Sequence, residues 1–155
     1  GQPFEEDLVR KRSHGREYAL QLLYQTEITK DLTEDQLLDF WRQLDENRES
    51  GTIDAEVKTF AEELVRIVRR NRAPIDHMIE SCAEHWDMNR MAVVDRNILR
   101  LGVAEIVYAL DVPNKVAINE AIELAKKFGD AESSRFVNGV LDQIAKKHAP
   151  ADKQN

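Results

Sequence analysis

The sequence predicts an all-α fold of about seven helices, arranged as two packed helical subdomains around a buried central helix. The main observation is the segment Met88–Leu110, in which apolar residues cover most of the circumference when it is plotted at about 3.6 residues per turn. The other apolar residues also follow helical spacing, and no segment alternates with the period of two that a half-buried strand requires. Connections are short, no internal repeat is present, and 155 residues are enough to bury a core.

The first helix is predicted from about Arg12 to Ile28, where Leu20 and Tyr24 share one face. Before it, residues 1–9 show no regular period and are expected to form a loose, flexible arm. The start of this helix is basic, with a cluster consisting of Arg10, Lys11, Arg12, His14 and Arg16. Cations at a helix N-terminus oppose the helix dipole and cost about 0.3–1 kcal/mol each. This placement indicates either that the basic residues bind a ligand or that they are a run of charges exposed to solvent.

The next two helices are predicted from capping residues. Thr33 and Gln36 have the spacing of a capping box, and the helix that they begin reaches about Leu44. Asp54 is placed to cap a third helix, which keeps helical spacing as far as Asn71.

The fourth helix and the central helix complete the middle of the chain. Pro74 suits the first position of the fourth helix, whose apolar stripe is expected to extend to Trp86. The central helix follows over Met88–Leu110. We expect the two helical subdomains to span about residues 10–85 and 86–148.

The last two helices are predicted over Val116–Phe128, closed by Gly129, and from Ser133 onward. Gly139 lies inside the last helix, where glycine costs about 1 kcal/mol relative to alanine. We therefore expect a neighbouring helix to approach it closely. Residues 149–155 are expected to form a flexible polar tail.

The composition is that of a soluble, acidic protein. A net charge of −7 disfavours indiscriminate binding to nucleic acid, although a local basic cluster still acts within a Debye length of about 8–10 Å. The central segment carries too many charged residues for a membrane span. The single cysteine excludes an internal disulfide and, with no signal segment, favours a cytoplasmic location.

The chain has no recognisable catalytic or cofactor motif, and we predict neither enzymatic activity nor a cofactor. The best metal-ligating group is His77, Cys82 and His85. Because Cys82 belongs to an apolar stripe, it is interpreted as a structural residue, and no metal site is predicted.

Surface recognition is the remaining possibility. Arg135 and Phe136 lie off the apolar row of the last helix, so they are candidates for binding unpaired bases together with the basic cluster. The alternative for Phe136 is a peripheral core residue.

Four segments resemble the NusB family of bacterial transcription antitermination factors. They are REYALQLLYQTE (residues 16–27), WDMNRMAVVDRNILRLGVAEI (86–106), VPNKVAINEAIELAKKFG (112–129) and SSRFVNGVLDQI (133–144). The resemblance extends from about Arg12 to Lys147, and within it residues 31–85 match only in helical pattern.

The resemblance implies a non-catalytic adaptor that binds single-stranded boxA RNA of ribosomal RNA transcripts together with the ribosomal protein NusE, within the RNA polymerase elongation complex. It also implies sites for both partners. The RNA-binding residues would be Arg10, Lys11, Arg12, Arg16, Lys115, Arg135 and Phe136. The protein partner would contact the surface around Tyr24 and Asp95.

The basic motif departs from the family pattern because Ser13, His14 and Gly15 interrupt its positive charges. We therefore expect weaker RNA binding by this chain alone and a smaller salt dependence, since each neutralised phosphate contributes about 0.7 to the slope. Two alternatives remain: an accessory domain of a ribosomal RNA methyltransferase, which the absence of a catalytic region disfavours, and a helical protein-interaction scaffold.

Overall fold

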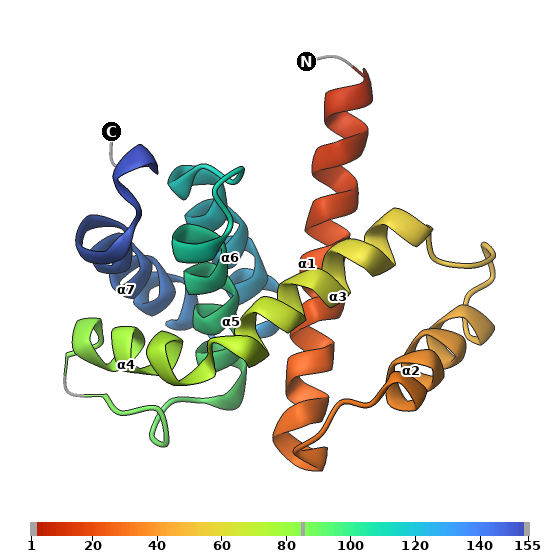
Figure 1. The fold of residues 1–155 in the computed structure, drawn as a ribbon, viewed down its shortest axis with the longest axis horizontal. Coiled ribbons are helices and arrows are strands. Elements are labelled where there is room, and N and C mark those ends of the chain that lie inside the picture. The colour runs from red at the N-terminus through yellow and green to blue at the C-terminus, as the bar shows by residue number, and fades with distance from the viewer. Residues whose placement is uncertain (1–2, 85, 154–155) are drawn as a thin grey trace. The chain divides into compact units, whose positions relative to one another are not determined.

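The computed structural model describes residues 3–84 and 86–153, whose helices divide into two compact units, Gly1–Glu63 and Leu64–Asn155 (Figure 1). The helices are α1 (Pro3–Thr29), α2 (Glu34–Glu46), α3 (Ala55–Arg70), α4 (Arg72–Cys82), α5 (Val93–Val103), α6 (Asn114–Phe128) and α7 (Ser133–His148). A π-helical turn, Ala104–Tyr108, continues α5, and a 3₁₀ turn, Ala151–Lys153, follows α7. The described ranges contain no strand, so the all-α prediction is confirmed.

The division between the units falls inside α3, about twenty residues earlier than the boundary near residue 85 expected from the sequence. The physical reason is the packing of α4. This helix contacts α5 and α7, so it belongs to the core of the second unit.

The first helix begins at Pro3, so the expectation of an irregular arm before Arg12 is wrong for residues 3–9. Residues 1–2 lie outside the described residues. Glu5 and Glu6 occupy the first turn, where acidic side chains stabilise the helix dipole. The basic cluster therefore lies in the third and later turns, and its cations do not oppose the dipole at the helix N-terminus as expected from the sequence.

The capping box predicted for α2 is present. The backbone N–H of Gln36 donates to the Thr33 hydroxyl over 3.1 Å, and the Gln36 side chain accepts from the Thr33 N–H over 2.8 Å. Leu37 and Trp41 are buried on the inward face of α2, and the Trp41 ring packs edge-to-face on Tyr18 of α1.

Asp45 connects the end of α2 to the start of α3. Its carboxylate accepts hydrogen bonds from the Lys58 ammonium over 2.8 Å and from the Ile53 N–H over 2.7 Å. The Lys58 contact, followed by the Ile53 contact, holds the pKa of Asp45 below its ordinary value of 3.8. A lowered pKa in the folded state stabilises the fold above the ordinary pKa, and this contribution is lost as pH falls through the folded-state pKa.

Asp45→Asn is therefore expected to lower the melting temperature at neutral pH and to make it less sensitive to acid as pH falls below the ordinary pKa of 3.8. Circular dichroism melts over a pH series measure both effects. Asp39→Asn is the control, because its ion pair with Arg42 lies on an exposed surface of the same helix. Equal acid sensitivity of wild type and Asp45→Asn would contradict the prediction.

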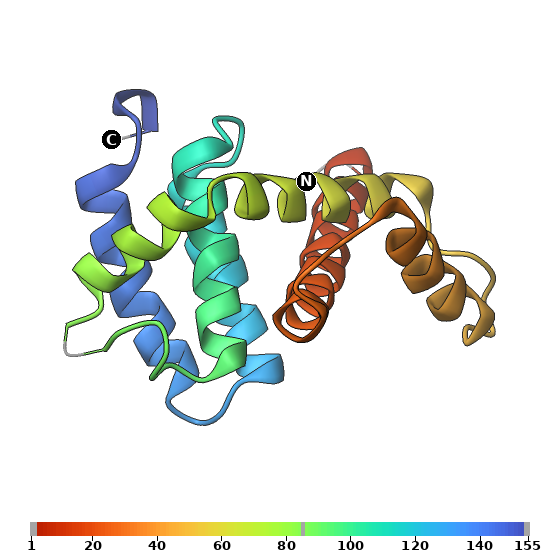
Figure 2. The same cartoon turned by 60° about the horizontal axis from the view of Figure 1, so that its bottom comes forward.

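In the second unit α5, α6 and α7 lie side by side, and α4 runs across α5 and α7 (Figure 2). Ile98, Leu99, Val103 and Ile106 are fully buried, which confirms the central buried helix. Its α-helical part starts at Val93, later than the sequence indicated, and the π-helical turn carries it to Tyr108.

The close approach between helices occurs at Gly102 of α5. A Cβ atom there would lie 2.5 Å from Cδ1 of the buried Leu141 on α7. By contrast Gly139 is exposed, and a Cβ atom at that position would meet nothing within 4 Å. The expectation of a close approach at Gly139 is therefore wrong, because this glycine faces away from the core.

The C-terminal segment packs against the end of the central helix. The Lys153 ammonium donates to the carbonyl oxygens of Glu105, Ile106 and Ala109 over 2.8–3.0 Å, which satisfies groups left open where the helix ends. Burial lowers the pKa of Lys153, and the carboxylate of Glu105 opposes this effect. Residues 149–153 are thus docked, and the prediction of a loose tail is wrong for them; residues 154–155 lie outside the described residues.

Candidate nucleic-acid and partner interface

The basic segment, defined as Arg10, Lys11, Arg12 and Arg16, lies on α1 in the first unit. Arg10 is exposed and forms an ion pair with Asp7 one turn earlier. Lys11 contacts Asp7 over 3.3 Å, Asp54 over 3.5 Å and Glu56 over 3.3 Å. Hydrogen bonds from Arg10 and then Lys11 lower the pKa of Asp7, and the bond to Asp7 raises the pKa of Lys11. Carboxylates of the chain itself therefore compete for these cations.

Arg12 and Arg16 pack over the ring of Phe60, each with its guanidinium carbon 5.3 Å from the ring centroid. Arg16 is only 3% exposed, so its guanidinium packs on Phe60 inside the unit and is not presented on the surface. A Cβ atom at Gly15 would lie 2.6 Å from Phe60 Cδ1. The glycine that interrupts the basic motif thus has a structural role, because it lets α1 approach α3 at Phe60.

The second unit contains a groove of about 390 Å³ that we call the Trp86 groove. Its lining residues are Trp86, Arg90, Met91, Ala92, Asp95, Asp130, Glu132, Arg135 and Phe136. Three residues predicted from the sequence as contact residues, Asp95, Arg135 and Phe136, therefore meet in one place. Sequence reasoning missed the fourth major component, the ring of Trp86.

The Trp86 ring packs edge-to-face on Phe136, with centroids 6.3 Å apart and planes 66° apart. The sequence pattern placed Trp86 in the stripe of α4, but this helix ends at Cys82. Trp86 instead lies in the following turn and is 49% exposed. The only local signal for this position was the run of turn-forming residues that begins at Asp87.

Asp95 lies in the first turn of α5. Its Oδ1 atom is buried and accepts no hydrogen bond within the described part of the chain. Leaving a buried polar atom without a partner costs about 1–3 kcal/mol. Tyr24, the other residue expected at a protein partner, belongs to α1 in the first unit and is 50% exposed.

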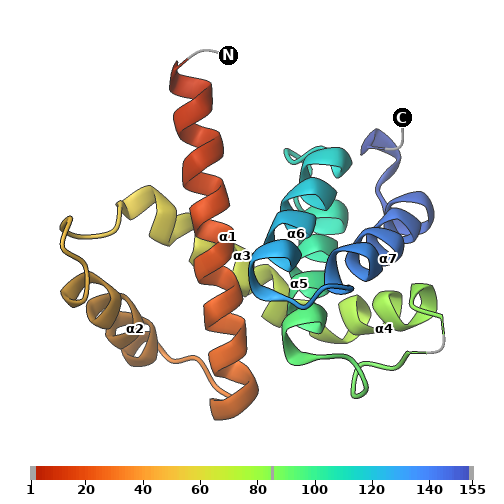
Figure 3. The ribbon, with the colours of Figure 1, turned by 180° about the vertical axis from the view of Figure 1, so that it is seen from behind.

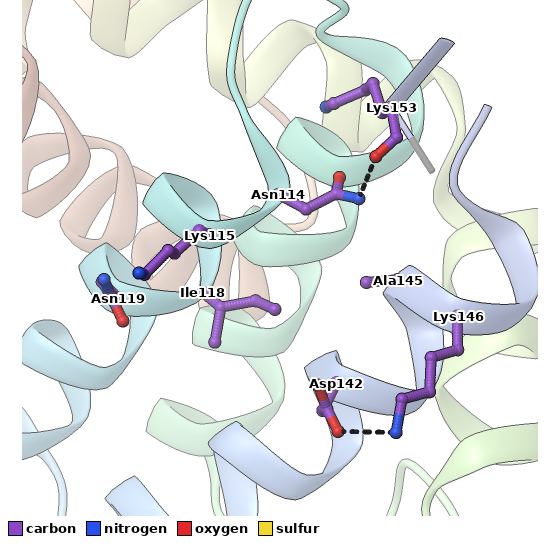
Figure 4. Close-up of a pocket in the computed structure, with 8 residues that line it drawn as sticks. All are labelled: Asn114, Lys115, Ile118, Asn119, Asp142, Ala145, Lys146 and Lys153. Carbon is purple, nitrogen blue, oxygen red and sulfur yellow. Dashed lines mark hydrogen bonds and ion pairs between the residues drawn. The ribbon is translucent and has the colours of Figure 1, made fainter. Parts of the chain in front are cut away.

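Lys115 does not join the Trp86 groove. It lines a separate pocket of about 540 Å³ at the start of α6, where Asn114 bonds to Lys153 (Figure 4). The helices α6 and α7 run antiparallel around a short turn (Figure 3). Phe136 lies near that turn, whereas about 20 Å of α6 separates Lys115 from the turn.

The residues considered as metal ligands are described only in part. Cys82 is buried in α4, and His85 lies outside the described residues. Across residues 3–84 and 86–153, no group of three potential ligand side chains is close enough to hold an ion. Within the same ranges no helix has the length and hydropathy to cross a membrane.

Sequence comparison places the chain among known proteins. Residues 13–146 match the model of the NusB family. The transcription antitermination protein NusB of Myxococcus xanthus is 47% identical over 134 residues, covering 86% of this chain and 94% of that protein. The NusB protein of Anaeromyxobacter dehalogenans strain 2CP-1 is 44% identical, with coverage of 93% and 96%.

Solved structures agree with this placement. NusB of T. maritima superposes with a TM-score of 0.75 at 38% identity, covering 92% of this chain and 95% of that one. A crystal structure of antitermination factors NusB and NusE in complex with dsRNA superposes with a TM-score of 0.76 at 28% identity, covering 90% and 98%. On the family match and the identity of these relatives, the chain belongs to the NusB family.

Proposed function

We propose that this chain is a transcription antitermination factor: a non-catalytic, cytoplasmic adaptor that binds single-stranded boxA RNA together with NusE and promotes elongation by RNA polymerase. The names of its relatives and the NusB–NusE–RNA complex of a relative support this function. The observation in this chain that carries it is the Trp86 groove, which combines two aromatic rings, two arginines and a buried carboxylate oxygen that has no hydrogen-bond partner among the described residues. These groups suit an RNA strand and a basic protein better than a small substrate.

The RNA would be held at two places. Arg10, Lys11 and Arg12 would contact phosphates on α1, while the buried Arg16 keeps Phe60 and Arg12 in position. On the second unit Arg135 would contact a phosphate beside Phe136. Lys115 would contact the RNA only if the RNA extends from the Trp86 groove along α6 to the start of that helix.

The ion pairs of Arg10 and Lys11 support the expectation of weak RNA binding by the chain alone. A phosphate must displace carboxylates from these cations before it gains their full charge. NusE would therefore supply a large part of the affinity in the proposed complex.

The protein partner would bind at Asp95 and Tyr24. A cationic donor from NusE would satisfy the buried Oδ1 of Asp95. The net charge of −7 favours encounter with a basic ribosomal protein, because complementary charge increases the association rate.

A salt series tests the RNA part of this function. The double variant Arg10→Gln/Arg12→Gln is expected to bind boxA RNA more weakly, with a slope of log K against log[salt] that falls by about 0.7 for each lost phosphate contact. Fluorescence anisotropy with labelled RNA, with and without NusE, measures affinity and slope. Arg42→Gln is a matched control, because Arg42 forms the same i, i+3 ion pair with Asp39 on α2. An unchanged slope in the double variant would remove the basic segment from the RNA site.

A further inference from the structure

We propose that Trp86 is an RNA-contacting residue, and that its indole ring, with Phe136 as a support, stacks on one unpaired base in the Trp86 groove. This inference rests on the proposed function and names a contact residue for it.

The geometry of the two rings assigns them different roles. Their planes meet at 66°, so a flat base cannot lie parallel to both rings at once. Trp86 is 49% exposed, whereas Phe136 is half-buried at the start of α7. The indole is therefore the more accessible surface for stacking, and Phe136 holds it in orientation through the edge-to-face contact.

The environment of Trp86 suits a nucleotide. Arg90 and Arg135 line the same groove and provide cations for a strand whose base lies on the ring. Asp95, Asp130 and Glu132 line it as well, and their carboxylates disfavour a phosphate beside them. The backbone of the RNA would therefore lie nearest to Arg90 and Arg135 while its base enters the groove.

Exposure of the indole also requires an explanation. Large aromatic side chains bury most of their surface in typical cores, and Trp41 of the first unit is only 6% exposed. Trp86 leaves about half of its surface open in a groove that also carries charged residues. Stacking on a base would cover this apolar surface without requiring a hydrogen-bond pattern, because every base has a π face.

Fluorescence separates this contact from general RNA binding. The chain contains two tryptophans, so Trp41→Phe leaves Trp86 as the only indole. Titration of this full-length variant with a synthetic single-stranded boxA RNA, with and without NusE, is expected to quench Trp86 emission and to protect it from acrylamide. If Trp41→Phe does not fold, acrylamide quenching of the wild type gives the same information, since buried Trp41 is poorly accessible.

Affinity provides an independent measurement. Trp86→Ala is expected to weaken RNA binding by about 5- to 150-fold, the range that corresponds to stacking of one base. Trp86→Phe should restore most of the affinity, whereas Trp86→Leu should not. A scan of single abasic substitutions along the RNA should find one position at which wild type and Trp86→Ala bind equally.

Each failure has a separate meaning. This inference is overturned if RNA binds without changing Trp86 emission and if Trp86→Ala binds RNA as tightly as the wild type. The proposed function would then stay in place. A second result would also overturn this inference: NusE alone quenches Trp86 emission, and Trp86→Ala loses affinity for NusE but not for RNA. That result would assign the ring to the protein partner. Absence of RNA binding even with NusE overturns the proposed function and this inference together.

Discussion

Leu141→Ala is expected to lower the free energy of unfolding by about 2–5 kcal/mol. Leu141 is fully buried, and its side chain lies where α7 meets Gly102 of the central helix. Truncation removes apolar contacts and leaves a cavity between α5 and α7. Urea denaturation followed by circular dichroism measures the loss, and a change below about 1 kcal/mol would contradict close packing of Leu141 against α5.

A methyl group on the facing glycine provides a specific test of the same contact. Gly102→Ala alone is expected to cost about 1–3 kcal/mol, because its Cβ atom would lie 2.5 Å from Leu141 Cδ1. In the double variant Gly102→Ala/Leu141→Ala the new methyl group occupies part of the cavity. The loss of stability measured for the double variant should therefore be smaller than the sum of the losses in the two single variants. Gly139→Ala is the control: nothing lies within 4 Å of the added atom, and a small gain in stability is expected. Additive losses at 102 and 141 would contradict direct contact.

Asp95→Ala is expected to weaken binding of NusE by about 30-fold or more, because loss of one partner from a buried charge pair costs about 2–5 kcal/mol. The stability of the free protein should stay unchanged or rise, since the variant removes a buried oxygen that accepts no hydrogen bond from residues 3–84 or 86–153. Isothermal titration calorimetry with NusE and thermal denaturation of the free chain measure the two effects.

The opposite response of affinity and stability distinguishes a binding residue from a structural one. Glu132→Ala is the comparison, because Glu132 lines the same groove but is exposed, so its removal should change mainly the association rate. Equal affinity of Asp95→Ala and wild type would exclude Asp95 from the partner surface. A loss of stability together with affinity would indicate that Asp95 supports the fold.

The helices and several of their ends could be predicted from the sequence because the determining contacts are local. The capping box at Thr33 joins groups three residues apart, and α6 ends at the predicted Gly129, whose N–H bonds to Ala125. The apolar spacing of the central helix likewise indicated its burial. The start of α1 was missed because residues 3–9 have no apolar period, although Glu5 and Glu6 suit a first helical turn.

The candidate site could be predicted only in part. The resemblance in sequence named Asp95, Arg135 and Phe136, and the fold brings these residues into one groove. Trp86 was absent from the predicted site because helical spacing alone assigned it to a stripe. The competing carboxylates around Lys11 were also missed, since Asp54 and Glu56 are distant in the chain and meet Lys11 only when α1 packs on α3.

The amino-acid pattern thus specified the helical class, the central buried segment and the family, because periodicity, caps and motifs depend on residues within a few turns of one another. Only the packing of the helices determines which glycines, Gly15 and Gly102, allow close helix contacts. It also determines where Lys153 donates its hydrogen bonds and which aromatic rings share a groove. Lys153 and Glu105 lie 48 positions apart, and no local pattern relates them. Such contacts arise from the way the helices pack in three dimensions, so they become visible only in the folded chain.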